Sequence, residues 1–148
     1  MAELIEIETE RLRLRQWIES DREPFARLNA DPRVMEFLPS ILDRVASDAM
    51  IDRLQAKIAE HGWGLWAVES KQNQKFIGFV GLQVPTANLP FSPCVEVGWR
   101  LAFEYWGKGY ATEAAQAQRE DDELWWLWSV WAVSGGNCRR NGESFPTD

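Results

Sequence analysis

The chain has 148 residues, which is enough for one domain with a hydrophobic core and too few for two ordinary domains. Hydrophobic residues make up 45% and charged residues 26%, a composition that excludes disordered, collagen-like and membrane-spanning proteins. The formal net charge of -7, with 16 basic and 23 acidic residues and no basic cluster, excludes a typical nucleic-acid-binding protein and one that binds anionic membranes.

The first predicted elements are one or two β-strands. Ile5 and Ile7 alternate with acidic residues, and Leu12 and Leu14 alternate with arginines. Alternation with a period of two is typical of a strand that has one solvent-exposed face. A short helix is expected after these strands, because Ser20 and Asp21 are residue types that cap a helix N-terminus.

A long amphipathic helix is predicted after a helical turn at residues 31–37. Ser40 with Asp43 resembles a capping box, and apolar residues then recur with helical spacing over about 18 residues until Gly62. His61 lies in the last turn, where a partial positive charge suits the helix dipole. We interpret His61 as a structural residue, with a catalytic role as the alternative.

Three further strands are expected in the second half of the chain. Residues 65–68 and 76–82 are rich in apolar and β-branched residues, and the polar connector 71–74 makes them a hairpin. Residues 84–93 contain three prolines and are predicted to form a loop. Residues 95–101 form the last predicted strand.

A glycine loop lies between that strand and an alanine-rich helix. It comprises residues 106–112, with Gly107 and Gly109 on either side of Lys108. Glycine permits a ligand to approach the backbone closely, and the free amides and dipole at a helix start attract an anion. These features favour a phosphate or pyrophosphate site, and the alternative is a flexible loop without a ligand. The spacing excludes a Walker loop, and the position late in the chain excludes a dinucleotide-binding fingerprint.

Five segments follow a known pattern in order and spacing: residues 9–15, 64–68, 76–82, 95–101 and 106–114. With these segments the sequence resembles the GNAT superfamily of N-acetyltransferases, in particular the branch of ribosomal-protein alanine and serine N-acetyltransferases. The resemblance covers residues 5–117, about three quarters of the chain. It implies an α/β fold with a mixed, mainly antiparallel central sheet flanked by helices, in which the C-terminal strands are incomplete.

The resemblance also implies acetyl-CoA as the co-substrate. The family's loop, usually written Gln/Arg-x-x-Gly-x-Gly/Ala, falls on Trp106, Gly109 and Ala111, so that Trp106 replaces the Gln or Arg. The loop amides would hold the pyrophosphate, and the backbone of the preceding strand would pair with the pantetheine arm like an added strand. The residues implied to bind the coenzyme are Trp99, Arg100, Leu101, Trp106, Gly107, Lys108, Gly109, Tyr110, Ala111 and Thr112.

The implied reaction is direct acetyl transfer from the thioester to a primary amine, on a protein N-terminus or a small molecule. Glu96 is the candidate general base, because it lies about ten residues before the loop, where several family members have a catalytic glutamate. The alternative is an exposed strand residue or the partner of a nearby arginine. Ser92 and Thr112 are weaker catalytic candidates. Candidates for the wall of the acceptor pocket are Trp63, Trp66 and Phe91, with core packing as the alternative for Trp66.

The resemblance ends after Ala117. Residues 118–148 include four tryptophans between Trp125 and Trp131, so we predict a core of residues 1–117 and an atypical Trp-rich tail of residues 118–148. Three explanations stay open: a shift of reading frame near residue 118, a divergent native end, and strands supplied by another subunit. An exposed Trp-rich segment would also promote self-association into a homo-oligomer.

Scarce cysteine and histidine predict that the protein has no metal centre. Cys94 and Cys138 lack the spacing of a zinc site or a disulfide framework, and His61 is the single histidine. The acidic beginning lacks the pattern of a signal peptide, and no apolar run reaches the about 20 residues of a membrane span. We therefore expect a cytoplasmic protein.

The sequence as a whole predicts an N-acetyltransferase whose partners are acetyl-CoA and an amine acceptor. Two other functions remain open. One is a CoA-binding but catalytically impaired fragment, because the C-terminal part departs from the family pattern. The other is a protein-interaction module that acts through the Trp-rich tail.

Overall fold

The computed structural model describes residues 4–36, 38, 40–83 and 96–121. The described strands form one antiparallel sheet in chain order: β1 (Ile7–Glu8), β2 (Leu12–Arg15), β3 (Leu65–Ser70), β4 (Phe76–Gln83) and β5 (Glu96–Leu101). The helices are α1 (Arg22–Asn29), α2 (Arg44–His61) and α3 (Tyr110–Glu120). This mixed α/β architecture, an antiparallel sheet flanked by helices, confirms the predicted fold class.

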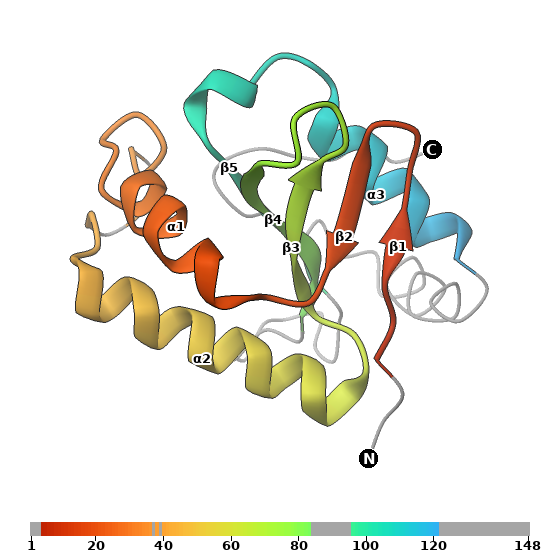
Figure 1. Ribbon diagram of the computed structural model, residues 1–148, viewed down its shortest axis with the longest axis horizontal. Helices are drawn as coiled ribbons and strands as arrows, with labels where there is room; N and C mark the ends of the chain where they lie inside the picture. The colour runs from red at the N-terminus through yellow and green to blue at the C-terminus, as the bar shows by residue number, and fades with distance from the viewer. Residues whose placement is uncertain (1–3, 37, 39, 84–95, 122–148) are drawn as a thin grey trace, which may run out of the picture.

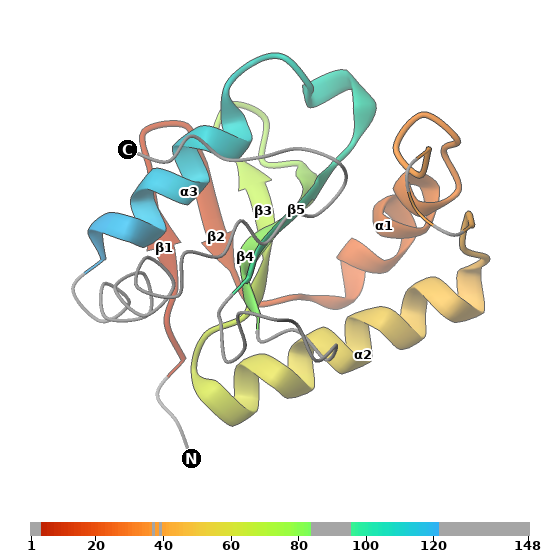
Figure 2. The same ribbon diagram turned by 180° about the vertical axis from the view of Figure 1, so that it is seen from behind.

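The helices cover both faces of the sheet. Figures 1 and 2 show α1 and α2 next to each other on one side and α3 on the other side, behind β1 and β2 in Figure 1. The strand β3 is buried on both faces for this reason. The largest fully buried apolar side chains are Trp66, Phe25, Leu12, Leu14, Ile51, Ile58, Ile77, Leu82, Val68 and Val80. Trp66 donates from its indole N–H to the Ile5 carbonyl at 2.8 Å, so it is a core residue and not part of an acceptor pocket.

The helix α1 begins where the sequence predicts, with Asp21 as its N-cap residue, but its side-chain cap is absent, and α2 begins differently from the prediction. The Asp21 carboxylate does not cap α1, because Arg15 binds it at 2.8 Å. Asp43 is itself the N-cap of α2 and accepts from the Ala46 N–H at 2.8 Å, so the helix starts after Asp43 and not at the predicted capping box. The length of α2, 18 residues, and its end at the left-handed Gly62 confirm the prediction.

The strand β4 lies very close to the backbone of its neighbours β3 and β5, and these close contacts fix the position of β5. Gly78 has a φ of 149°, and a Cβ at this position would overlap the Arg100 carbonyl of β5. A Cβ at Gly81 would overlap the Gly64 carbonyl at the start of β3. These contacts require glycine at both positions, because a methyl group there would force the strands apart. None of the described helices is long and apolar enough to cross a membrane.

Candidate functional site

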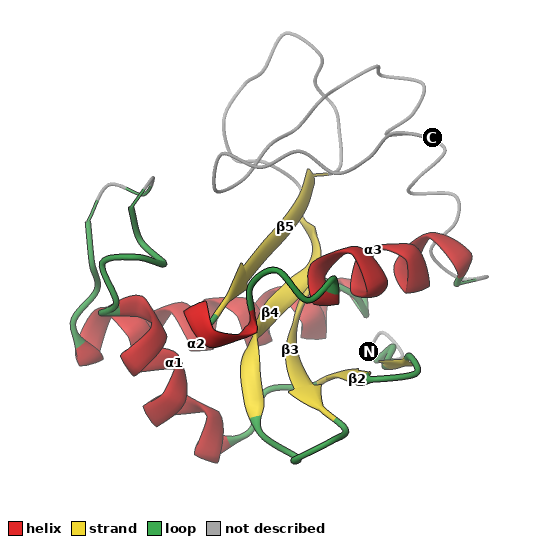
Figure 3. Cartoon of the chain, turned by 90° about the horizontal axis from the view of Figure 1, so that it is seen from above, coloured by secondary structure: helices red, strands yellow, loops and turns green. Residues whose placement is uncertain are grey.

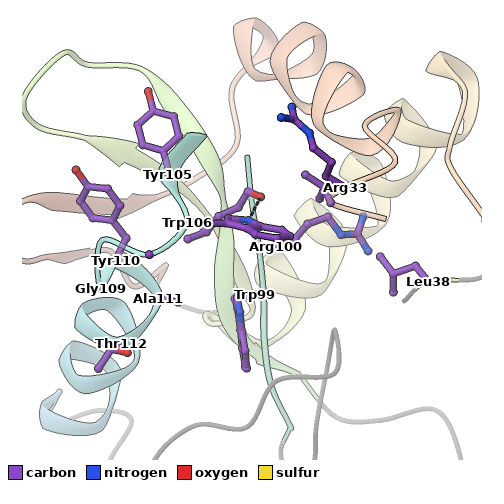
Figure 4. A pocket seen from close by; sticks show the side chains of 13 residues that line it. Arg33, Leu38, Trp99, Arg100, Tyr105, Trp106, Gly109, Tyr110, Ala111 and Thr112 are labelled. Atoms are coloured by element: carbon purple, nitrogen blue, oxygen red, sulfur yellow. Dashed lines mark hydrogen bonds between the residues drawn. The ribbon is translucent and has the colours of Figure 1, made fainter. Parts of the chain in front are cut away.

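A cavity of about 420 Å³ lies where the end of β5, the loop after it and the first turn of α3 meet. Figure 3 shows this loop crossing from the end of β5 to the start of α3, and Figure 4 shows the cavity from close by. The cavity is lined by Arg33, Val34, Leu38, Trp99, Arg100, Leu101, Tyr105, Trp106, Gly107, Gly109, Tyr110, Ala111 and Thr112. Every residue that the sequence assigned to the coenzyme, except Lys108, is therefore a lining residue.

The glycine loop exposes the first amides of α3. Gly107 and Gly109 have φ values of 72° and 78°, in the left-handed region that favours glycine. Gly109 is the N-cap of α3, and the first helical hydrogen bond runs from the Glu113 N–H to the Gly109 carbonyl at 3.0 Å. The N–H groups of residues 110–112 thus have no partner within the helix, and the N-cap offers no side chain to them. This arrangement suits an anion.

The outer edge of β5 faces the cavity. The Ala102 N–H donates to the Ile77 carbonyl of the neighbouring chain segment at 2.9 Å. Because the direction of backbone groups alternates along an antiparallel strand, the N–H and C=O groups of Trp99 and Leu101 point away from β4. The Trp106 indole N–H donates to the Leu101 carbonyl at 2.9 Å, which agrees with this direction (Figure 4). An extended ligand with amide groups can pair with such an edge.

The side of the cavity opposite α3 is built from the segment that follows α1. Arg33, Val34 and Leu38 lie there, and the Arg100 side chain points toward them from β5 (Figure 4). The sequence predicts a helical turn at residues 31–37 but did not assign these three residues to the site, because the segment has no recognisable binding motif. Its position follows from the tertiary structure alone.

Arg100 joins β5 to both helices on the α1 side. Its Nη1 donates to Asn29 Oδ1 at 2.7 Å, and Asn29 Nδ2 donates to Ser47 Oγ at 3.0 Å. All three side chains are buried. Hydrogen bonds of this kind hold a buried side chain in one orientation. The position of Arg100 in the cavity wall is therefore set by α1 and α2.

Arg33 is held on the rim of the cavity. It binds Asp31 at 2.7 Å, and its guanidinium carbon lies 4.0 Å from the centroid of the Phe103 ring. The hydrogen bond from Arg33 lowers the pKa of Asp31 below its ordinary value, more than partial burial raises it. The ion pair therefore remains charged at neutral pH.

The remaining residues that the sequence analysis proposed for the site lie in different parts of the chain. Glu96 is the first residue of β5, where its backbone pairs with Gln83, while its side chain lies outside the described part of the structure. Ser92 and Phe91 also lie outside the described residues. Thr112 lines the cavity. The exposed Lys108 places its ammonium 5.7 Å from the centroid of the Tyr105 ring.

His61 and Trp63 lie at the end of α2 and do not line the cavity. Their rings are stacked with centroids 5.1 Å apart. The position of His61 as the last residue of α2 agrees with the structural interpretation of this residue. Within the described part of the chain, no group of three or more His, Cys, Asp or Glu side chains could hold a metal ion.

The predicted boundary at residue 117 falls inside α3, which continues to Glu120. Gln118 is fully buried, and neither its Nε2 nor its Oε1 has a hydrogen-bond partner among the described residues. Burying such an amide without partners costs about 1–3 kcal/mol. Residues 122–148 lie outside the described part, so the division into core and tail stays a prediction.

Comparison with known families decides where this chain belongs. A family model described as an acetyltransferase (GNAT) domain matches residues 11–126. The chain belongs to the GNAT family. The uncharacterized protein YkkB of Bacillus subtilis is 33% identical over 110 residues, which cover 74% of this GNAT chain and 63% of YkkB. The matched part therefore spans less than two thirds of that relative.

Solved structures show the same fold. An acetyltransferase from Agrobacterium tumefaciens superposes with a TM-score of 0.66 at 21% identity, covering 97% of this chain and 91% of that one. The microcin self-immunity acetyltransferase MccE, in complex with acetyl-CoA and AMP, has a TM-score of 0.60 at 14% identity, covering 93% and 89%. An acetyltransferase from Salmonella typhimurium, which modifies the N-terminal serine of a ribosomal protein, has a TM-score of 0.59 at 14% identity, covering 97% and 93%.

Proposed function

We propose that this GNAT chain binds acetyl-CoA in the cavity and transfers the acetyl group to a primary amine. One observation carries the proposal: a single cavity combines the exposed first amides of α3, behind two left-handed glycines, with the outward-facing edge of β5. The amides suit a pyrophosphate, and the strand edge suits the amide-containing pantetheine arm. The acetyl-CoA complex of MccE supports the proposal by fold similarity.

In the proposed complex, each part of the chain has a separate task. The N–H groups of residues 110–112 bind the pyrophosphate, and the backbone of Trp99 and Leu101 aligns the pantetheine arm. Trp106 fixes the Leu101 carbonyl through its indole N–H, and so holds the loop against the end of β5. Acetyl-CoA supplies the activated acetyl group as a thioester.

The chemistry requires a neutral amine, which attacks the thioester carbonyl. The C–N bond forms, the C–S bond breaks, and the amine loses a proton while the thiolate leaving group gains one. An α-amino group with a pKa of about 7.7–8.0 is more often neutral at pH 7 than a lysine with a pKa of about 10.4. Glu96, on the strand that lines the cavity, is proposed as the base that takes the proton from the amine.

The proposed acceptor is a protein N-terminal α-amine or a small amine. The resemblance to ribosomal-protein N-acetyltransferases supports it, as does the Salmonella typhimurium neighbour that modifies an N-terminal serine. With a ribosomal-protein N-terminus as the acceptor, the proposed location is the cytoplasm. The family match ends at residue 126, before the end of the chain, and this supports a second function, coenzyme binding without turnover. The Trp-rich tail supports self-association.

Calorimetry with acetyl-CoA and an assay of free thiol release test these functions together. The acceptors are a panel of small amines and peptides with free N-termini. Binding with thiol release supports the acetyltransferase, binding without release supports the second function, and no binding overturns both.

A Glu96→Gln variant tests the role of the base. We expect the rate of transfer to fall by about 10²–10⁴-fold, most strongly at low pH, with nearly unchanged affinity for acetyl-CoA. Equal rates for the variant and the wild type at every pH would show that Glu96 is not the base.

A further inference from the structure

An acidic residue, Glu113, lies near the N-terminus of α3, which is the end of the helix that is proposed to bind pyrophosphate. Glu113 belongs to the first turn of α3, and its side chain is partly buried. A helix N-terminus carries the equivalent of about half a positive charge, so one nearby carboxylate can cancel its attraction for a phosphate. The chain must therefore compensate Glu113 if this helix start is to bind an anion.

Residues of the turn between β1 and β2 compensate the negative charge of Glu113. Arg11 Nε donates to Glu113 Oε1 at 2.6 Å, and the Arg11 backbone N–H donates to Oε2 at 3.0 Å. The Thr9 hydroxyl also donates to Oε2, while it accepts from the Leu12 N–H at 2.9 Å. These three donors reach across more than one hundred residues of sequence, and we call Thr9, Arg11 and Glu113 the clasp.

The Arg11 guanidinium also lies next to the glycine loop. Its central carbon is 4.3 Å from the centroid of the Tyr110 ring. A Cβ at Gly109 would lie 3.6 Å from Arg11 Nη2. Gly109 and Tyr110 both line the cavity, whereas Glu113 does not. The guanidinium thus binds the carboxylate through Nε and approaches the loop through Nη2.

Two groups of the clasp, the Glu113 carboxylate and the Arg11 guanidinium, are charged at neutral pH. Partial burial raises the pKa of Glu113, but hydrogen bonds from Thr9 and Arg11 outweigh this effect and hold the pKa below its ordinary value. The hydrogen bond to Glu113 raises the pKa of Arg11 further. The clasp therefore presents an ionised carboxylate and a matching cation beside the loop.

We propose that Arg11 is a positioning residue that neutralises Glu113 and so keeps the first turn of α3 attractive to a pyrophosphate group. The inference rests on the proposed function, since the pyrophosphate is that of acetyl-CoA. The clasp also ties the start of α3 to the β1–β2 turn, which holds the loop amides in place. Arg11 acts here through Glu113 and does not itself bind the ligand.

A double-mutant cycle tests this role. Calorimetry at low salt measures the affinity for acetyl-CoA and, separately, for inorganic pyrophosphate in the wild type, Arg11→Ala, Glu113→Gln and the double variant. Arg13→Ala is the matched control, because Arg13 lies in the same hairpin with 43% side-chain exposure against 42% for Arg11, and pairs with Glu8 and Glu69 but not with α3. Thermal unfolding of each variant measures its stability.

We expect Arg11→Ala to weaken both ligands on the order of tenfold, because Glu113 is left uncompensated. Glu113→Gln binds at least as tightly as the wild type, and the double variant recovers to within about threefold of it. Arg11→Lys keeps the charge but loses the Nε hydrogen bond and the stacking on Tyr110, so its affinity lies between those of Arg11→Ala and the wild type. Arg13→Ala binds like the wild type.

Several results would overturn the inference. A double variant as weak as Arg11→Ala would mean that Arg11 touches the ligand directly. Glu113→Gln as weak as Arg11→Ala, with matching losses of stability, would mean that the pair only supports the fold. If the wild type bound pyrophosphate but not acetyl-CoA, the proposed function would be wrong, and the double-mutant cycle would still test the role of Arg11 with pyrophosphate. If it bound neither ligand, the proposed function and this inference would both be wrong.

Discussion

The two ends of α3 differ in whether their polar side chains have hydrogen-bond partners among the described residues. At the N-terminal end, Glu113 receives hydrogen bonds from Thr9 and from the backbone and side chain of Arg11. At the C-terminal end, the amide of Gln118 is fully buried without a hydrogen-bond partner among the described residues. Buried polar groups are tolerated where a neighbouring element supplies partners, and they lower stability where none does.

We propose that this difference corresponds to a difference in function. The N-terminal end belongs to the cavity and to the part of the chain that follows the GNAT pattern. Gln118 directly follows the predicted boundary at residue 117, and the match to the GNAT family model continues to residue 126. We therefore expect changes at the first end to alter ligand binding, and changes at the second to alter stability.

The largest expected effect is that of Gly109→Asp at the N-terminal end. Its φ of 78° disfavours a side chain, and a carboxylate at the N-cap would repel a phosphate. We expect the affinity for acetyl-CoA, measured by calorimetry, to fall about 100-fold or more. Gly62→Asp is the matched control, since Gly62 has a φ of 85° at the end of α2 and does not line the cavity. Equal affinity of both variants for acetyl-CoA would show that the loop is not part of the coenzyme site.

Gln118→Leu should stabilise the chain without changing ligand affinity. The substitution removes a buried amide that lacks partners among the described residues and keeps a side chain of similar size. We expect the free energy of unfolding to rise by about 1–3 kcal/mol, measured by chemical denaturation. Gln116→Leu, at an exposed position of the same helix, should change it by less than about 0.5 kcal/mol. A loss of stability in Gln118→Leu would show that the amide has partners beyond the described residues.

The smallest expected effect concerns the pH dependence of stability. The pKa of Glu113 is lowered in the folded chain by Thr9 and Arg11, despite the opposing effect of burial. Its stabilising contribution is therefore complete above the pKa of an unfolded glutamate and disappears as the pH falls through the lowered folded pKa. We expect the melting temperature to fall less between pH 6 and pH 3 in Glu113→Gln than in the wild type. If the melting temperatures of the two proteins depended on pH in the same way, this would contradict the conclusion that Thr9 and Arg11 stabilise the ionised Glu113.

Local patterns allowed much of the fold to be predicted. The alternation in residues 65–82 and the helical spacing before Gly62 predicted the β3–β4 hairpin and the length of α2, because both depend on neighbouring residues. The glycine loop was predicted for the same reason. Asp21 is the N-cap residue of α1 as predicted, but its carboxylate makes no capping hydrogen bond, because Arg15 on another element binds it.

The parts of the site that sequence missed depend on contacts between distant segments. Arg33 and Leu38 reach the cavity only because α1 and its following segment pack beside β5. Arg11 and Glu113 both lie in segments that carry the family resemblance, yet nothing local indicates that they pair. Spacing in sequence does not specify such contacts, whereas the packing of α3 against β1 and β2 does.

Magnetic resonance of the isotope-labelled chain tests the central claim most directly. Inorganic pyrophosphate should shift the amide signals of residues 107–112, and acetyl-CoA should shift these together with the signals of Trp99 and Leu101. A second hollow, lined in part by Arg27, Lys75 and Glu104 between α1 and β4, serves as the internal reference and should not respond. Shifts confined to that hollow, or no shift in the loop and the β5 edge, would contradict the assignment of the cavity to acetyl-CoA.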